Sequence, residues 1–222
     1  MKKLFVWAVM AFIGAQAQAQ IVSSRSSMTT REVIADPVSY KGWSTFGVEY
    51  LSGTFSGDGV SDSFSGLAIN YTKAVSITQS IPLFIEWGIG AQYSFFSDEE
   101  QYEIEHKVHY ASVKVPVNLV YDFQIPNTKV NLDPYLGIKL RGNVWGESKY
   151  ESKEYDVSKT YNLFDSDESD CKRFQVGWNI GVKARFNNAF YVGIGYGSDF
   201  NDFAEEESVK INELSLSLGV IF

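Results

Sequence analysis

The end of the chain, from Ile211 to Phe222, alternates between apolar and polar side chains up to the final residue. This period of two is typical of a β-strand with one apolar face. A soluble protein rarely ends on such a strand, because an apolar free edge promotes aggregation. In a closed membrane barrel the apolar face meets lipid, the polar face meets the lumen, and pairing with the first strand removes the edge. The C-terminus therefore predicts a membrane-embedded barrel.

The N-terminus predicts export. Residues 1–19 contain two lysines, an apolar run from Leu4 to Ile13, and small residues spaced for signal peptidase. The apolar run is too short for a membrane helix, which needs about 20 residues. We therefore predict a signal peptide over 1–19, a polar periplasmic arm over 20–41, and a barrel over 42–222.

Period-two alternation recurs along the whole predicted barrel and indicates an all-β fold. The connections alternate between long and short, as in an eight-stranded antiparallel up-and-down transmembrane β-barrel with both termini in the periplasm. We expect a bulge at Pro116, which cannot donate to the ladder, and a hairpin turn at Asn187-Asn188. The predicted strands are 42–52, 63–73, 82–96, 108–123, 130–144, 174–186, 189–200 and 211–222, and the predicted long loops are 53–62, 97–107, 145–173 and 201–208.

Composition excludes some classes of function. The formal net charge of −8 argues against a nucleic-acid partner, whose phosphates require a basic surface. Cys171 is the only cysteine, so the chain forms no internal disulfide. The two histidines, His106 and His109, match no catalytic signature, and the acidic run from Asp165 to Asp170 lacks the Gly and Glu of a calcium loop. We predict no catalytic residues, no cofactor and no metal.

Charged residues on the predicted inward faces form the candidate site. An eight-stranded barrel is only wide enough for its own side chains, so these charges should pair into a lumenal network. Five bases face three acids, which leaves open a narrow or gated path that favours anions. The predicted network is Glu49, Glu86, Lys114, Lys139, Arg141, Lys183, Arg185 and Glu213.

The signal peptide, the segment from Tyr110 to Tyr121 and the terminal Phe222 resemble the outer-membrane β-barrel domain family, the porin-like and PorT-like small barrels of Gram-negative bacteria. The resemblance implies a cell outer membrane location, Phe222 as a C-terminal insertion signal, and contact with the barrel-assembly machinery, outer membrane lipid and lipopolysaccharide. Family members share a fold and a location rather than one activity.

Several functions therefore stay open. The first is a structural or surface-interaction role without catalysis, in which the acidic extracellular loops contact lipopolysaccharide through cations or bind a protein partner. The alternatives are a small low-conductance or gated pore and, from the PorT-like branch, an accessory factor for protein secretion. A soluble lipocalin-like carrier is disfavoured, because the inward positions are Gly, Ser, Asn and charged residues rather than large apolar ones.

Overall fold

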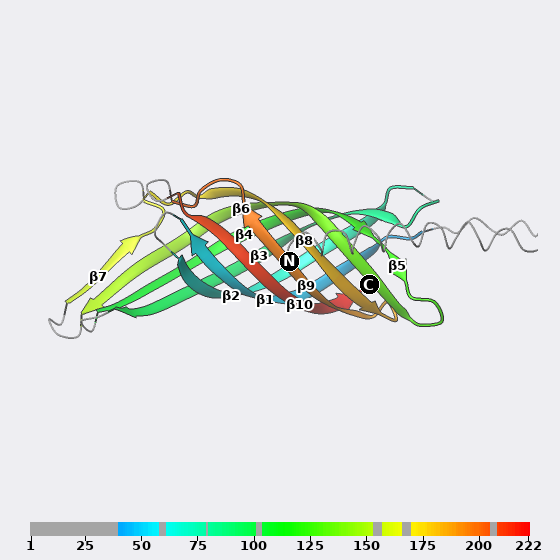
Figure 1. Cartoon of the computed structure of the whole chain (residues 1–222), viewed down its shortest axis with the longest axis horizontal. Helices are drawn as coiled ribbons and strands as arrows, with labels where there is room; N and C mark the ends of the chain where they lie inside the picture. The colour runs from blue at the N-terminus through cyan, green and yellow to red at the C-terminus, as the bar shows by residue number, and fades with distance from the viewer. Residues whose placement is uncertain are drawn as a thin grey trace, which may run out of the picture. The chain divides into compact units, whose positions relative to one another are not determined.

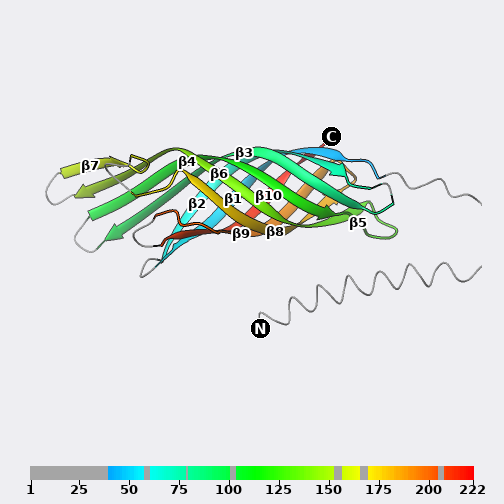
Figure 2. The same cartoon turned by 90° about the horizontal axis from the view of Figure 1, so that it is seen from above.

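The computed structural model describes residues 40–57, 61–78, 80–100, 104–152, 157–165, 170–204 and 208–222 (Figures 1 and 2). The predicted signal peptide and all but the last two residues of the predicted arm lie outside the described residues. So do most of the acidic run after Asp165 and parts of the predicted long loops. No helix among the described residues is long and apolar enough to cross a membrane.

Within these ranges, eight long strands form a closed antiparallel barrel, which confirms the predicted fold. Each strand pairs with its neighbours in the chain, and the first pairs with the last, with Phe46 opposite Val220. The long strands are β1 (Trp43–Ser56), β2 (Ser61–Ser76), β3 (Leu83–Glu100), β4 (Ile104–Tyr121), β6 (Val130–Ser152), β8 (Phe174–Phe186), β9 (Phe190–Asp199) and β10 (Lys210–Ile221).

The alternation of side chains builds two different faces. In β1, Phe46 and Val48 are exposed on the outer face, whereas Thr45 and Leu51 are buried inside. The outer face carries so many exposed apolar side chains that water would be an unfavourable solvent for it, and lipid a favourable one. The inner face holds the polar residues, so the core of the molecule is its lumen.

Two ends of the barrel differ in their connections. At the turn end, β3 follows β2 closely, the short strand β5 (Phe123–Gln124) pairs with the start of β6, and a tight turn joins β8 to β9. That turn has Asn187 and Asn188 at φ 52° and 50°, as predicted. The left-handed region suits Asn better than most residues. The other end, called the loop end here, carries the longer connections.

The predictions of loops over 97–107 and 145–173 were partly wrong. β3, β4 and β6 continue well past the predicted strand ends, and β7 (Val157–Asn162) pairs with the extended part of β6. These segments were predicted as loops because they are acidic and lose their apolar outer face. A sheet above the membrane needs no such face, since water surrounds it.

Pro116 does not form a bulge, contrary to the prediction. It keeps its register opposite Lys139 in β6. The bulge lies at Val144 of β6, because Ala111 pairs with Trp145 while Ser112 pairs with Asn143. β4 also pairs with β3 in the same register before and after Pro116. The missing N–H of the proline therefore interrupts this pairing locally but adds no extra residue to the strand.

Candidate functional site: a charge-compensated lumen

The structure places all eight residues of the predicted network on the inner face of the barrel. They come from six strands, so closure of the sheet is what brings them together. Pairing a charge in this environment matters, because removing one partner of a buried ion pair costs about 3–5 kcal/mol. The ion pairs form three layers along the lumen. One lies at its centre, one lies toward the loop end, and one lies at the turn end.

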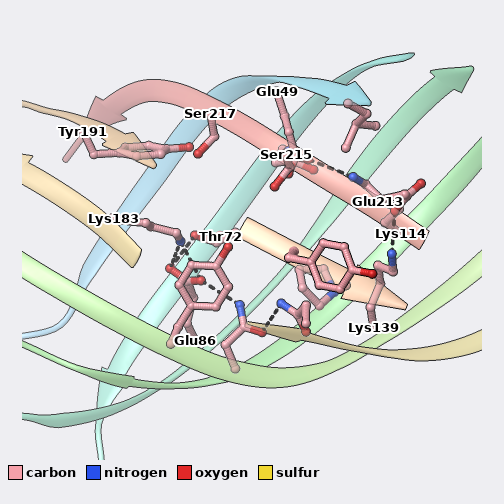
Figure 3. A pocket seen from close by; sticks show the side chains of 18 residues that line it. Glu49, Thr72, Glu86, Lys114, Lys139, Lys183, Tyr191, Glu213, Ser215 and Ser217 are labelled. Carbon is pink, nitrogen blue, oxygen red and sulfur yellow. Dashed lines mark hydrogen bonds and ion pairs between the residues drawn. The ribbon is translucent and has the colours of Figure 1, made fainter. Parts of the chain in front are cut away.

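The central layer consists of lysine–glutamate pairs around a small cavity (Figure 3). Lys114 Nζ lies 2.8 Å from Glu49 Oε2, and Lys183 Nζ lies 2.6 Å and 2.7 Å from the two carboxylate oxygens of Glu86. Glu86 also accepts hydrogen bonds of 3.1 Å from Thr72 and from Asn118. Glu49 also accepts a hydrogen bond of 2.9 Å from Asn70, so both carboxylates have more than one donor.

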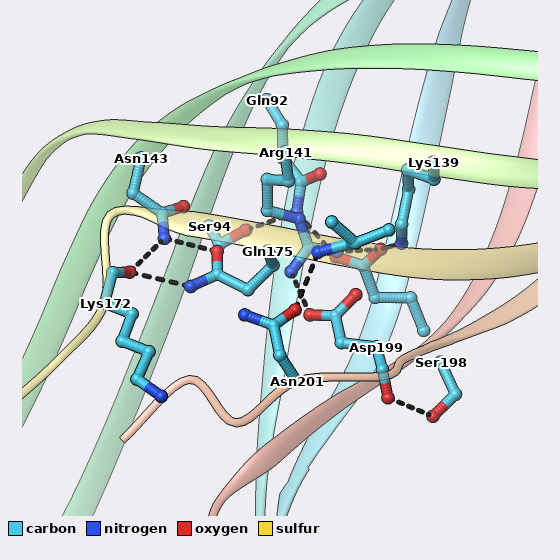
Figure 4. Close-up of polar contacts among 12 residues, drawn as sticks. Gln92, Ser94, Lys139, Arg141, Asn143, Lys172, Gln175, Ser198, Asp199 and Asn201 are labelled. Atoms are coloured by element: carbon cyan, nitrogen blue, oxygen red, sulfur yellow. Dashed lines mark hydrogen bonds and ion pairs between the residues drawn. The ribbon is translucent and has the colours of Figure 1, made fainter. Parts of the chain in front are cut away.

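The second layer, toward the loop end, is organised by Arg141 (Figure 4). Its Nη1 lies 3.2 Å from Asp199 Oδ2, and its Nη2 lies 2.6 Å from Glu213 Oε2. Glu213 also receives Lys139 Nζ at 2.6 Å and Gln92 Nε2 at 2.8 Å. The Arg141 and Asp199 side chains have no exposed surface, so this layer is the most deeply buried charge in the barrel.

The third layer, at the turn end, is centred on Arg185. Its guanidinium contacts both carboxylate oxygens of Asp133 and lies 2.9 Å from Asp122. It also lies over the ring of Trp43, with Cζ 3.7 Å from the ring centroid, in a cation–π contact. Arg185 thus joins the lumen charges to the aromatic residues at this end.

Three acids of these layers were missing from the sequence prediction. Asp133 and Asp199 lie in the lumen, and Asp122 lies at its turn end. The expected excess of positive charge is therefore wrong, and with it the basis for an anion-favouring path. Strand parity could have found two of them, since Asp133 shares a face with Lys139 and Arg141 in the same strand.

An apolar plug closes the loop end of the lumen. Phe55 and Phe64 of the barrel wall are buried in one cluster with Phe203. The ring centroids of Phe55 and Phe64 are 4.8 Å apart, and those of Phe55 and Phe203 are 5.6 Å apart. Leu163 and Phe164, which follow β7, enter the same cluster. The plug consists of Phe55, Phe64, Tyr110, Leu163, Phe164, Phe203, Val209 and Ile211.

A smaller apolar cap covers the turn end. Phe84 and Val120 are almost fully buried there. Trp43 packs on Phe84 with ring centroids 4.5 Å apart, and Tyr40 and Tyr135 pack against the same group. The charged lumen therefore lies between two apolar clusters.

The cavity between the plug and the cap is small, with a volume of about 100 Å³, and most of the residues that line it are polar or charged. It has room for a few water molecules, each of which occupies about 30 Å³ in the liquid, whereas small-molecule sites measure about 300–1,000 Å³. Tyr135 and Tyr191 fill the space beside it, and each lies against a pair of glycines. A Cβ added at Gly181 or Gly195 would collide with the Tyr135 hydroxyl.

The remaining predicted residues lie away from the lumen charges. His106 Nε2 is 2.9 Å from Ser148 Oγ and its ring stacks on Tyr150, whereas His109 Nδ1 is 3.0 Å from the Tyr93 hydroxyl. Phe222 is exposed on the outer face, and its backbone exchanges two hydrogen bonds with Ser44. In the described part of the chain, no group of three or more His, Cys, Asp or Glu side chains could hold a metal ion.

The family model of the outer membrane protein beta-barrel domain matches residues 5–222. The attachment invasion locus protein Ail of Yersinia pestis is 17% identical over 82% of this chain and 100% of that chain, with a TM-score of 0.47. Neisserial surface protein A is 16% identical over 80% and 96%, with a TM-score of 0.44. The outer membrane enzyme PagL is 15% identical over 78% and 98%, with a TM-score of 0.44. No curated protein is similar enough to match.

Proposed function

Because the chain belongs to the outer membrane protein beta-barrel domain family, and is thus an outer-membrane β-barrel, we propose that it serves as a structural or surface-interaction protein rather than as a pore or an enzyme. The turn end faces the periplasm and the loop end faces the exterior, as in other outer-membrane barrels. The extended parts of β3, β4 and β6, together with β7, then project from the cell surface.

The observation that carries this proposal is the plugged and charge-compensated lumen. A conducting path needs a continuous wet passage. Here Phe164 and Phe203 fill the outer mouth, and the Arg141 layer below them is fully buried. An ion that entered would have to displace apolar side chains and then break several ion pairs. These features disfavour the low-conductance pore.

The surroundings of His106 also support a role without catalysis. A general base must reach both a nucleophile and the substrate. The ring of His106 is sandwiched between Tyr150, whose centroid lies 4.2 Å away, and the edge-on ring of Phe96 at 5.8 Å. Its partner Ser148 is buried. This arrangement resembles sheet packing more than an open reaction site.

The remaining contacts of the proposed protein follow from its location. The outer face binds membrane lipid. We assign Phe222 to recognition by the barrel-assembly machinery, because its exposed ring sits at the end of the closing strand. No observation in the lumen or on the outer face favours the secretion-factor alternative.

Planar-bilayer recording of the refolded mature chain tests the proposal. An unboiled sample should first migrate as a folded, heat-modifiable barrel. We expect no discrete conductance steps. The double variant Phe164→Ala, Phe203→Ala should remain silent or flicker, because the Arg141 layer persists. Regular steps in the wild-type barrel would contradict a closed lumen and restore the pore.

A further inference from the structure

At the loop end, a sheet made of β3, β4, β6 and β7 projects beyond the barrel (Figures 1 and 2). The last pair between β2 and β3 is Ser65 with Phe95, and the last between β6 and β8 is Gly142 with Phe174. Beyond these points, β3, β4, β6 and β7 pair only with one another, in that order. We call this part the projecting sheet. It has two faces and two open edges.

The two faces differ in chemistry. On the outward face, Lys107 Nζ bridges Glu105 at 2.9 Å and Glu151 at 3.4 Å. The hydrogen bond to Glu105 raises the pKa of Lys107, and the one from Lys149 lowers the pKa of Glu151. On the inward face four rings touch in sequence across the four strands, and they are Phe96, His106, Tyr150 and Tyr161. The sheet is therefore amphipathic.

The two open edges differ as well. The edge of β3 ends in Asp98, Glu99 and Glu100, and such a run of charges discourages strand pairing. The edge formed by β7 reads Val-Ser-Lys-Thr-Tyr-Asn, has no proline, and carries one charge, on Lys159. All six residues of β7 are exposed. The β7 edge is thus the more favourable one for adding a strand.

The ladder between β6 and β7 shows which backbone groups remain open. Leu163 N donates to Gly146 O at 3.0 Å, which sets the alternation of hydrogen-bonded pairs in this antiparallel ladder. Tyr161 and Lys159 therefore bond to β6, while the N–H and C=O groups of Ser158 and Thr160 point away from it. Within the described ranges, no strand pairs with that side of β7.

We propose that β7 accepts an extended segment of a partner protein as a further antiparallel strand of the projecting sheet. The inference rests on the proposed surface-interaction function and names the class of partner. A row of amide donors and acceptors at strand spacing is matched by another polypeptide backbone, rather than by a glycan or a lipid.

The side chains of β7 specify the pattern of that segment. Residues opposite Val157, Lys159 and Tyr161 would form the non-hydrogen-bonded pairs, in which side chains approach most closely. These positions lie on the aromatic face. A complementary segment therefore carries an acidic residue opposite Lys159 and apolar residues opposite its two neighbours on that face.

A second copy of this chain in the same membrane fits the edge poorly. Two such copies are related by rotation about the membrane normal. Barrel strands tilt by about 35–45° from that axis, so the two β7 strands would cross steeply instead of running antiparallel. The partner is therefore not a neighbouring copy in the same membrane.

Hydrogen exchange with a synthetic probe tests the inference on the full barrel in lipid nanodiscs. The probe is the peptide Thr-Val-Thr-Glu-Thr-Val-Thr, whose Glu pairs with Lys159 in the antiparallel register. We expect saturating peptide to slow exchange of the Ser158 and Thr160 amides at least tenfold. The matched control peptide is N-methylated at its third and fifth residues, which removes the donors that face β7 and keeps every side chain.

Two variants distinguish addition of the peptide as a strand on the β7 edge from other modes of peptide binding. Thr160→Pro removes a donor that faces the open edge and leaves the bonds to β6, so it should abolish protection. The Lys159→Glu variant should no longer bind the probe peptide. It should instead bind a peptide in which Lys replaces the Glu of the probe. Equal protection by the methylated peptide, or no protection at all, would overturn the inference. Conductance of the barrel would instead overturn the proposed function and leave this result unchanged.

Discussion

One strand, β6, passes through two environments, and comparing them explains much of the molecule. Within the barrel its inner face carries Lys139 and Arg141 and its outer face is apolar. In the projecting sheet the inner face carries Tyr150 and the outer face carries Lys149 and Glu151. The charged face of the sheet is thus the inner face where lipid surrounds the barrel and the outer face where water surrounds the projecting sheet. On the inside, the apolar plug lies at the boundary between these two regions.

The comparison implies that ion pairs in the two regions contribute differently to the free energy of unfolding. Arg141 is fully buried between Glu213 and Asp199, whereas the side chain of Lys149 is 42% exposed. A buried partner cannot be replaced by water. An exposed pair can be, and typical exposed pairs contribute only about 0–1 kcal/mol.

Arg141→Ala should have the largest effect. It leaves Glu213 and Asp199 without their shared partner, and we expect the free energy of unfolding to fall by about 3–5 kcal/mol. Urea unfolding in lipid vesicles, followed by tryptophan fluorescence, measures the change. Arg141→Lys should lose less, because it keeps the charge. A loss below 1 kcal/mol for the Ala variant would show that water already reaches this layer.

Gly195→Ala should have the next largest effect. The new methyl would collide with the Tyr135 hydroxyl, and overpacking of this kind costs about 1–3 kcal/mol. The matched control is Gly142→Ala, because a Cβ there meets nothing within 4 Å. The same unfolding assay compares the two. Equal losses for both variants would mean that the lumen packs more loosely than described.

Insertion of one alanine between Trp145 and Gly146 should act on one region only. The bulge at Val144 shifts the strand by one residue, which keeps Ser148 and Tyr150 on the inner face above Arg141 and Asn143. One additional residue after the bulge would reverse the alternation beyond this point. We expect faster hydrogen exchange in the projecting sheet and little change in the urea midpoint of the barrel. Exchange that accelerates equally in both regions would contradict their independence.

Lys149→Ala should have the smallest effect. It removes a contact to Glu151 on the exposed face, where water can replace the lost partner, so we expect the smallest loss of stability among these variants. The effect should shrink further in 1 M salt, where the screening length is about 3 Å. A salt-independent loss of several kcal/mol would show that the projecting sheet supports the barrel.

The barrel could be predicted from sequence because its outer face must be apolar along every strand. The projecting sheet could not, for two physical reasons. Its outer face is charged, so the apolar signal disappears, and the bulge at Val144 breaks the period at the point where the predicted strand ends. Both features removed the signal for a strand that in fact continues to Ser152.

The candidate site was predicted in part. The alternation placed the eight charged residues on one face, and the same parity includes Asp133 and Asp199, which were overlooked. The plug gave no comparable signal. Leu163, Phe164 and Phe203 lie outside the long strands and follow no period, so only the folded chain brings them to the outer mouth.

Thiol labelling of the lumen tests the closed-barrel account most directly. In a Cys171→Ser background, Ser217→Cys places a thiol on the cavity wall with little change in volume. Native vesicles would be treated with a small cationic thiosulfonate from each side, and Ser56→Cys, which is exposed at the loop end, serves as the reactive control. The account predicts that Ser217→Cys reacts only after unfolding. Labelling of the folded barrel at the rate of the control would show that the lumen is open.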